Sequence, residues 1–156
     1  MGIIRLLLSI TFCALAVATI SAQQDPVSWD FSTERIGNDT YTIKLEGTID
    51  AGWFIYSQFL GQEDGPIPTT VYIEPQKNAI ELVGLVEEKG NRKEGFDPVF
   101  EVNLVKFSKQ VTFTQTIKLR GGDANQITGY IEYMTCNDES CLPPKEVPFT
   151  LELDRS

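Results

Sequence analysis

The feature that most constrains the fold of this chain is an alternation of apolar and polar residues in several separate segments. Residues 40–49 alternate aromatic or aliphatic side chains with polar ones, and residues 111–119 and 147–153 repeat the pattern. Successive side chains of a strand point to opposite faces, so this alternation predicts half-buried β-strands. No segment keeps a period of 3.6 residues over three turns, and we therefore expect no α-helix in the folded part of the chain.

Shorter segments of the same kind complete an all-β pattern. Weaker strand candidates cover residues 27–32, 53–58, 70–74, 80–86, 98–105 and 127–134, and turn residues cluster at 37–39, 90–91 and 121–123. About nine short strands separated by turns predict an antiparallel, immunoglobulin-like β-sandwich. A length of 156 residues suits one domain of this kind, and we assign it to residues 23–156.

The first 22 residues have the layout of a secretory signal peptide. Arg5 precedes an apolar run over residues 6–20, and the small residues Ser21 and Ala22 follow. The alternative is a retained membrane anchor, but the run is shorter than the roughly 20 residues that span a bilayer. We expect cleavage near Ala22, a periplasmic or secreted location, and no stable membrane insertion afterwards.

Composition excludes several classes of function. The chain has no histidine, which removes every Ser-His-Asp or Cys-His catalytic arrangement and any histidine-ligated zinc site. Its formal net charge of -9 argues against nucleic-acid binding, which needs a basic face. We expect neither a metal nor a cofactor. Of the three cysteines, Cys13 lies in the signal segment, so the mature chain keeps a pair, Cys136 and Cys141.

The cysteine pair is the one candidate for chemistry, and its spacing leaves two interpretations open. An exported protein can oxidise such a pair, and four intervening residues allow a small ring at a hairpin end. The pair is therefore either a structural disulfide or a redox couple. So small a ring constrains the unfolded chain little, which weakens the structural interpretation. Asp138 and Glu139 between the cysteines should raise a thiol pKa, so strong activation of a free thiolate is not expected.

Three blocks of sequence carry a family resemblance that favours the redox interpretation. They cover residues 51–58 with 65–69, residues 95–101, and residues 133–144, where the two cysteines precede Pro143 and Pro144. In this order the blocks resemble the N-terminal periplasmic domain of the DsbD transmembrane thiol:disulfide interchange proteins. The resemblance extends over nearly all of residues 26–153.

The resemblance implies an immunoglobulin-like sandwich with a redox-active pair formed by Cys136 and Cys141, in which Cys141 makes the mixed disulfide with partners. It matches Phe96 to the aromatic residue of a cap loop that shields the pair until a partner docks. It also matches Phe54 and Tyr56 to aromatic positions beside the pair. A domain of this kind passes electrons from a membrane reductase, through a thioredoxin-like domain, to oxidised periplasmic proteins by thiol-disulfide exchange.

The chain also departs from the family. Well-known members have five residues between the cysteines, whereas this chain has four. We expect a stand-alone domain, without the transmembrane segment and the thioredoxin-like domain of the family, that works with thioredoxin-like proteins and a membrane reductase on another chain. Two alternatives remain open: a secreted binding module with an inert disulfide, whose exposed aromatic residue would be Trp29 or Trp53, and a chaperone for surface proteins.

Overall fold

The structure is a computed structural model that describes residues 25–61, 65–76, 79–121 and 124–154. These residues contain β-strands and no α-helix, as the alternation predicts. The strands are β1 (Val27–Arg35), β2 (Thr40–Ile49), β3 (Phe54–Tyr56), β4 (Thr70–Ile73), β5 (Ile80–Asp97), β6 (Val102–Leu119), β7 (Gln126–Tyr133), β8 (Thr135–Cys136) and β9 (Lys145–Glu152). The signal segment lies outside the described residues, and no described helix is long and apolar enough to cross a membrane.

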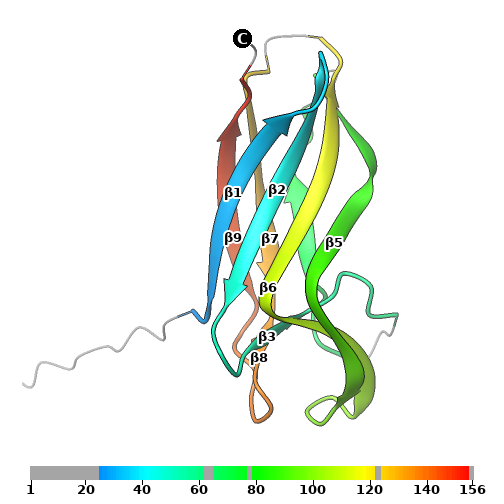
Figure 1. The fold of residues 1–156 in the computed structure, drawn as a ribbon, viewed down its shortest axis with the longest axis vertical. Helices are drawn as coiled ribbons and strands as arrows, with labels where there is room; N and C mark the ends of the chain where they lie inside the picture. Colours follow the sequence, from blue (N-terminus) through cyan, green and yellow to red (C-terminus); the bar gives the residue numbers. More distant parts are fainter. Residues whose placement is uncertain (1–24, 62–64, 77–78, 122–123, 155–156) are drawn as a thin grey trace, which may run out of the picture.

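The strands form two antiparallel sheets that face each other (Figure 1). The larger sheet has the order β1-β2-β6-β3-β8, with β5 also paired to β6, and the smaller sheet has the order β4-β7-β9. Phe107 of β6 pairs with both Ile55 of β3 and Arg92 of β5, so these two strands flank β6 on opposite sides. This arrangement confirms the immunoglobulin-like sandwich expected from the sequence.

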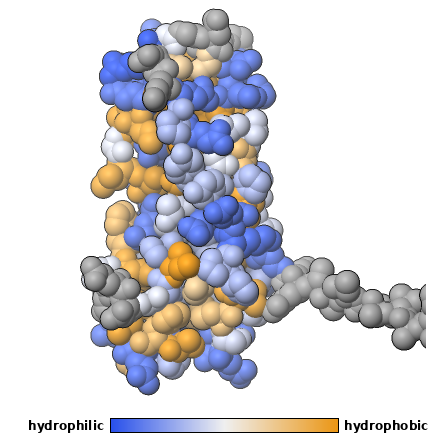
Figure 2. Space-filling model, turned by 180° about the vertical axis from the view of Figure 1, so that it is seen from behind, coloured by the Kyte–Doolittle hydropathy of each residue, from blue (hydrophilic) through white to orange (hydrophobic). Residues whose placement is uncertain are grey.

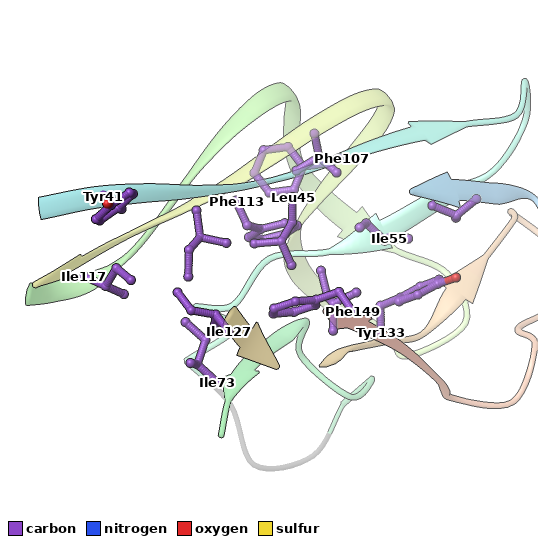
Figure 3. Packing of buried hydrophobic residues seen from close by; sticks show 14 of the residues in the cluster. Tyr41, Leu45, Ile55, Ile73, Phe107, Phe113, Ile117, Ile127, Tyr133 and Phe149 are labelled. Atoms are coloured by element: carbon purple, nitrogen blue, oxygen red, sulfur yellow. The ribbon is translucent and has the colours of Figure 1, made fainter. Parts of the chain in front are cut away.

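The main hydrophobic core fills the space between the two sheets. The alternating residues of β2 and β6 supply one side of it, including Tyr41, Leu45 and Phe113. Ile127 of β7 and Phe149 of β9 point toward them from the smaller sheet (Figure 3). Each of these side chains is almost fully buried, and burial of an aliphatic or aromatic side chain stabilises a fold by about 1.5–3 kcal/mol.

Strands β5 and β6 are longer than the sequence suggests. The structure continues β5 from residue 86 through the predicted turn at residues 90–91. Of the candidate strand at 98–105, residues 98–101 form the turn between β5 and β6, and the rest joins the candidate at 111–119 in β6. The glycine at position 90 belongs to an irregularity in register between the two strands. A Cβ atom at Gly90 would lie 2.4 Å from the carbonyl oxygen of Gln110, so glycine serves here for close approach of two strands and not for a turn.

The long β5–β6 ribbon reaches beyond the main core and creates a second, smaller hydrophobic cluster. Figure 1 draws β3, β8 and the loop after β8 at the same lower end as the tip of this ribbon. Seen from behind, hydrophobic atoms gather toward that end of the molecule (Figure 2). The second cluster contains Phe54, Tyr56, Leu104 and Cys136. The cysteine pair therefore sits apart from the core that holds the sandwich together.

Candidate functional site

The two cysteines lie on either side of a tight turn that follows β8. Cys136 pairs with Phe54 of β3, and Cys141 returns beside Cys136 as an isolated antiparallel bridge. A disulfide joins the two residues, whose Cα atoms are 4.0 Å apart. The Asn137 side chain stabilises the turn, because its Oδ1 accepts the backbone N–H groups of Glu139 at 2.9 Å and Ser140 at 2.7 Å.

The cysteines differ in their exposure to solvent. Cys136 is fully buried, with 0% of its surface accessible, whereas Cys141 is half-buried. Both pack against apolar side chains of the second cluster, with Leu60, Phe100, Val102 and Met134 around them. An incoming molecule therefore meets Cys141 first, while Cys136 lies behind it in an apolar environment.

Strand β3 places two aromatic rings in this cluster. Phe54 and Tyr56 lie on one face of the strand, while Ile55 points to the opposite face and into the main core. The Phe54 and Tyr56 rings are perpendicular, with centroids 5.6 Å apart. Phe100 adds a third ring, perpendicular to Tyr56 at 5.9 Å. The structure thus brings Phe54 and Tyr56 together with the cysteine pair.

Phe96, the residue that the resemblance matches to the cap, lies elsewhere. Its surface is 64% exposed, and it does not belong to the second cluster. Phe96 pairs with Asn103 across the β5–β6 ribbon, and both residues are exposed. Phe100, four residues later in the same block of sequence, is the ring that packs over Tyr56. Sequence reasoning missed Phe100, although the block that carries the resemblance contains it.

A buried polar network supports the cluster, and Asp97 is its centre. Asp97 Oδ2 accepts hydrogen bonds from the Tyr56 hydroxyl at 3.0 Å and from Lys106 Nζ at 3.2 Å. Its Oδ1 accepts the backbone N–H groups of Val99 at 2.9 Å and Phe100 at 3.3 Å. The Asp97 carboxylate therefore stabilises the turn after β5. It also links this turn to Tyr56 of β3 and Lys106 of β6.

The charges of this network are almost completely removed from water. The Asp97 side chain is 0% exposed and the Lys106 side chain 9%. Burial raises the pKa of Asp97, but the hydrogen bonds from Lys106 and Tyr56 outweigh it and hold the pKa below its usual range. Burial and the neighbouring carboxylate raise the pKa of Tyr56, so its hydroxyl stays protonated and donates. The Lys106 ammonium also lies 3.8 Å from the centroid of the Phe54 ring.

Sequence reasoning missed Lys106, although a signal for it exists. Leu104 and Lys106 occupy alternate positions of β6, so both face the second cluster. A lysine at a position where the alternation calls for an apolar residue indicates a buried partner, which is Asp97 of the neighbouring strand. Only the tertiary structure shows that this pair lies beside the cysteines.

A second carboxylate holds the segment that follows β3. Glu88 of β5 accepts hydrogen bonds from the Ser57 hydroxyl at 2.5 Å and from the Gln58 backbone N–H at 2.9 Å. In the segment that these hydrogen bonds stabilise, Leu60 packs against the second cluster, while Phe59 remains exposed. Three separate parts of the chain therefore surround the cysteine pair: β3 with the segment after it, the tip of the β5–β6 ribbon, and residues 134–141.

The chemistry open to this site is that of a thiol and its disulfide. Within the described ranges, no group of three or more His, Cys, Asp or Glu side chains is placed to hold a metal ion. Neither tryptophan is fully exposed, although the alternative of a secreted binding module calls for an exposed one. Trp29 packs against Phe113 and Tyr133 at the core, and Trp53 is half-buried.

Comparisons with known proteins agree with this description. The N-terminal domain of DsbD from Neisseria meningitidis, in its reduced form, superimposes with a TM-score of 0.54 at 14% sequence identity, covering 83% of this chain and 86% of that one. The N-terminal periplasmic domain of ScsB from Proteus mirabilis gives a TM-score of 0.56 at 17% identity, covering 84% of this chain and 48% of that one. At such identities these similarities establish the fold.

No curated protein sequence matches the chain significantly. The family model of the N-terminal region of the thiol:disulfide interchange protein DsbD matches residues 21–153, which include the cysteine pair and every residue of the network around it. The chain therefore belongs to the family of DsbD N-terminal domains.

Proposed function

We propose that this domain is a periplasmic thiol-disulfide relay module in which Cys136 and Cys141 are the working redox couple. The observation that carries the proposal is the position of the disulfide. It joins residues only five apart in sequence, in a small apolar cluster separate from the main core. Such a bond adds little to the stability of the fold, because it closes a very short loop. Membership of the DsbD family supports the same conclusion.

The difference in exposure supports a separate role for each cysteine. In the reduced domain, the Cys141 thiolate attacks the disulfide of an oxidised partner, one partner sulfur leaves as a thiolate, and a mixed disulfide forms. The Cys136 thiolate then attacks Cys141, which releases the second partner thiolate and restores the Cys136–Cys141 disulfide. Two electrons pass to the partner, and the two protons of the cysteine thiols are released to solvent or to the partner.

The aromatic residues would control access to this couple. We assign the shielding of the pair to Phe100, with Phe54 and Tyr56 as the walls of the cluster. Phe96 is exposed at the tip of the same ribbon and is available to contact a docking partner. The electrons would come from a membrane reductase on another chain, and thioredoxin-like periplasmic proteins would be donors or acceptors.

Two measurements test this function. The first is the reduction potential of the pair against a glutathione series, where a value well below about -300 mV indicates a structural disulfide and a higher value a working couple. The second is trapping with the Cys136→Ala variant, which leaves Cys141 without a resolving thiol and should accumulate a mixed disulfide with a thioredoxin-like protein. A Cys141→Ala variant is the control. If neither variant traps a partner and the potential is low, the disulfide is structural.

A further inference from the structure

A hollow of about 450 Å³ lies beside the redox pair and has no part in the chemistry described above. Its lining is unusual in a chain with a net charge of -9, because it contains three lysines, Lys93, Lys106 and Lys109. Trp53, Phe54, Asp50 and Asp138 also line it. The hollow therefore combines basic groups with the apolar surfaces of two aromatic side chains.

The lysines are arranged so that their charges are only partly compensated. Lys93 of β5 lies directly opposite Lys106 of β6 in the strand register, and like charges at such positions repel. Asp97 and the Phe54 ring compensate Lys106. Among the residues that the structure describes, neither Lys93 nor Lys109 lies within 4.0 Å of a carboxylate.

The two aspartates of the lining reduce its positive charge, but they leave Lys93 and Lys109 without a direct ion-pair partner. Asp50 and Asp138 border the hollow, but neither forms an ion pair with a lysine in the described part of the chain. Lys93 and Lys109 thus present two ammonium groups that the domain itself leaves for an external anion. An anion bound there would also relieve the repulsion between Lys93 and Lys106.

The hollow is close to the cysteines but does not include them. Phe54 lines it and pairs with Cys136, and Asp138 belongs to the turn between the two cysteines. Phe54 therefore belongs both to the lining of the hollow and to the cluster that contains Cys136. Because neither cysteine lines the hollow, it suits an anchoring point and not the reacting group itself.

We propose that Lys93 and Lys109 anchor a carboxylate side chain of the protein whose disulfide reacts with Cys141. This inference rests on the proposed function and adds to it the kind of partner that the site selects, a polypeptide with an acidic residue a few positions from its cysteine. Trp53 and Phe54 contact the apolar part of the same segment. The local basic group directs such partners to the redox end of a chain that is acidic overall.

Disulfide-linked peptide dimers test this anchoring, because their cysteine can be held constant while a neighbouring charge changes. Three probes are the dimers of acetyl-Cys-Gly-Xaa-Xaa-amide, with Xaa as Glu, Gln or Lys. The rate of oxidation of the reduced domain is measured with each probe at low and high salt. We expect the Glu probe to react about three to ten times faster than the Gln probe at low salt, and the Lys probe to react more slowly.

Variants locate the effect on the domain. In Lys93→Gln/Lys109→Asn, where Asn tolerates the positive φ of 65° at position 109, the Glu-to-Gln rate ratio should fall below about two. Lys118→Gln is the matched control, because it removes one exposed charge from the other end of β6 and should leave the ratio unchanged. A wild-type ratio near one, or a ratio that the double variant does not lower, overturns the anchoring while the relay function stands.

A binding measurement keeps the two proposals separate. If no probe oxidises the reduced domain, the relay function fails, and anchoring is tested on the disulfide form with acetyl-Ser-Gly-Glu-Glu-amide. Shifts of the Lys93 and Lys109 side-chain NMR signals that disappear with the Gln peptide support the carboxylate site. The absence of such shifts overturns it.

Discussion

The ion pair between Lys106 and Asp97 should be a large contributor to the stability of the redox end of the domain, and Lys106→Met is the change that tests it. Methionine keeps most of the length and the apolar stem of lysine but removes the ammonium group. It leaves the fully buried Asp97 carboxylate with the Tyr56 hydroxyl and two backbone N–H groups as its remaining partners.

The expected loss follows from this geometry. Removing one member of a buried ion pair destabilises a protein by about 3–5 kcal/mol, because the other charge stays buried without compensation. The remaining hydrogen bonds of Asp97 place the value near the lower limit, about 3 kcal/mol. That is a large part of the 5–15 kcal/mol by which a domain is usually stable.

Urea unfolding of the disulfide form measures this loss. With a slope of about 1–3 kcal/mol per molar urea, the midpoint should fall by about 1–3 M without a change in slope. Lys118→Met, an exposed change on the same strand, should shift the midpoint little. In a double-mutant cycle, Asp97→Asn should lose much of its effect once Lys106 is Met, with a coupling of at least about 1 kcal/mol. A Lys106→Met effect below about 0.5 kcal/mol, or additive effects in the cycle, would refute the reasoning.

Three further predictions concern the shield, the acid response and the ribbon. Phe100→Ala should speed reduction of the disulfide by dithiothreitol several-fold, whereas Phe96→Ala should leave the rate unchanged. Equal rates in the two variants would contradict the proposal that Phe100 shields the disulfide. Burial raises the pKa of Asp25, but hydrogen bonds, the one from Lys145 foremost, outweigh burial and lower the pKa overall. The Asp25 carboxylate therefore stabilises the fold above about pH 4, and this stabilisation is lost as the pH falls through the lowered pKa. Asp25→Asn should therefore flatten the decline of urea midpoints between pH 5 and pH 2, and an unchanged slope refutes this. Gly90→Ala should destabilise the domain by about 1–3 kcal/mol in the same assay, because its Cβ would meet a carbonyl oxygen at 2.4 Å; wild-type stability would contradict the close approach.

The sequence by itself determined the class of fold and the family to which the chain belongs. Alternation in residues 40–49 and 111–119 depends on the local geometry of an extended chain, and the structure places strands at both. The three blocks of sequence resemble those of the DsbD N-terminal domains, and the family match confirms that membership. These features can be recognised in short segments because neighbouring residues carry the information.

Tertiary structure decided what surrounds the cysteines. Strand β5 runs through the predicted turn at residues 90–91 because Gly90 allows its backbone to approach that of β6, a contact between residues 20 positions apart. Which of the two rings, Phe96 or Phe100, packs against Tyr56 depends on how the ribbon is oriented toward β3. Tyr56 and Asp97 are 41 residues apart in sequence, and they become partners only when β3 and β5 flank the same strand. Alternation specifies that a side chain is buried, but strand pairing decides which distant residue it meets.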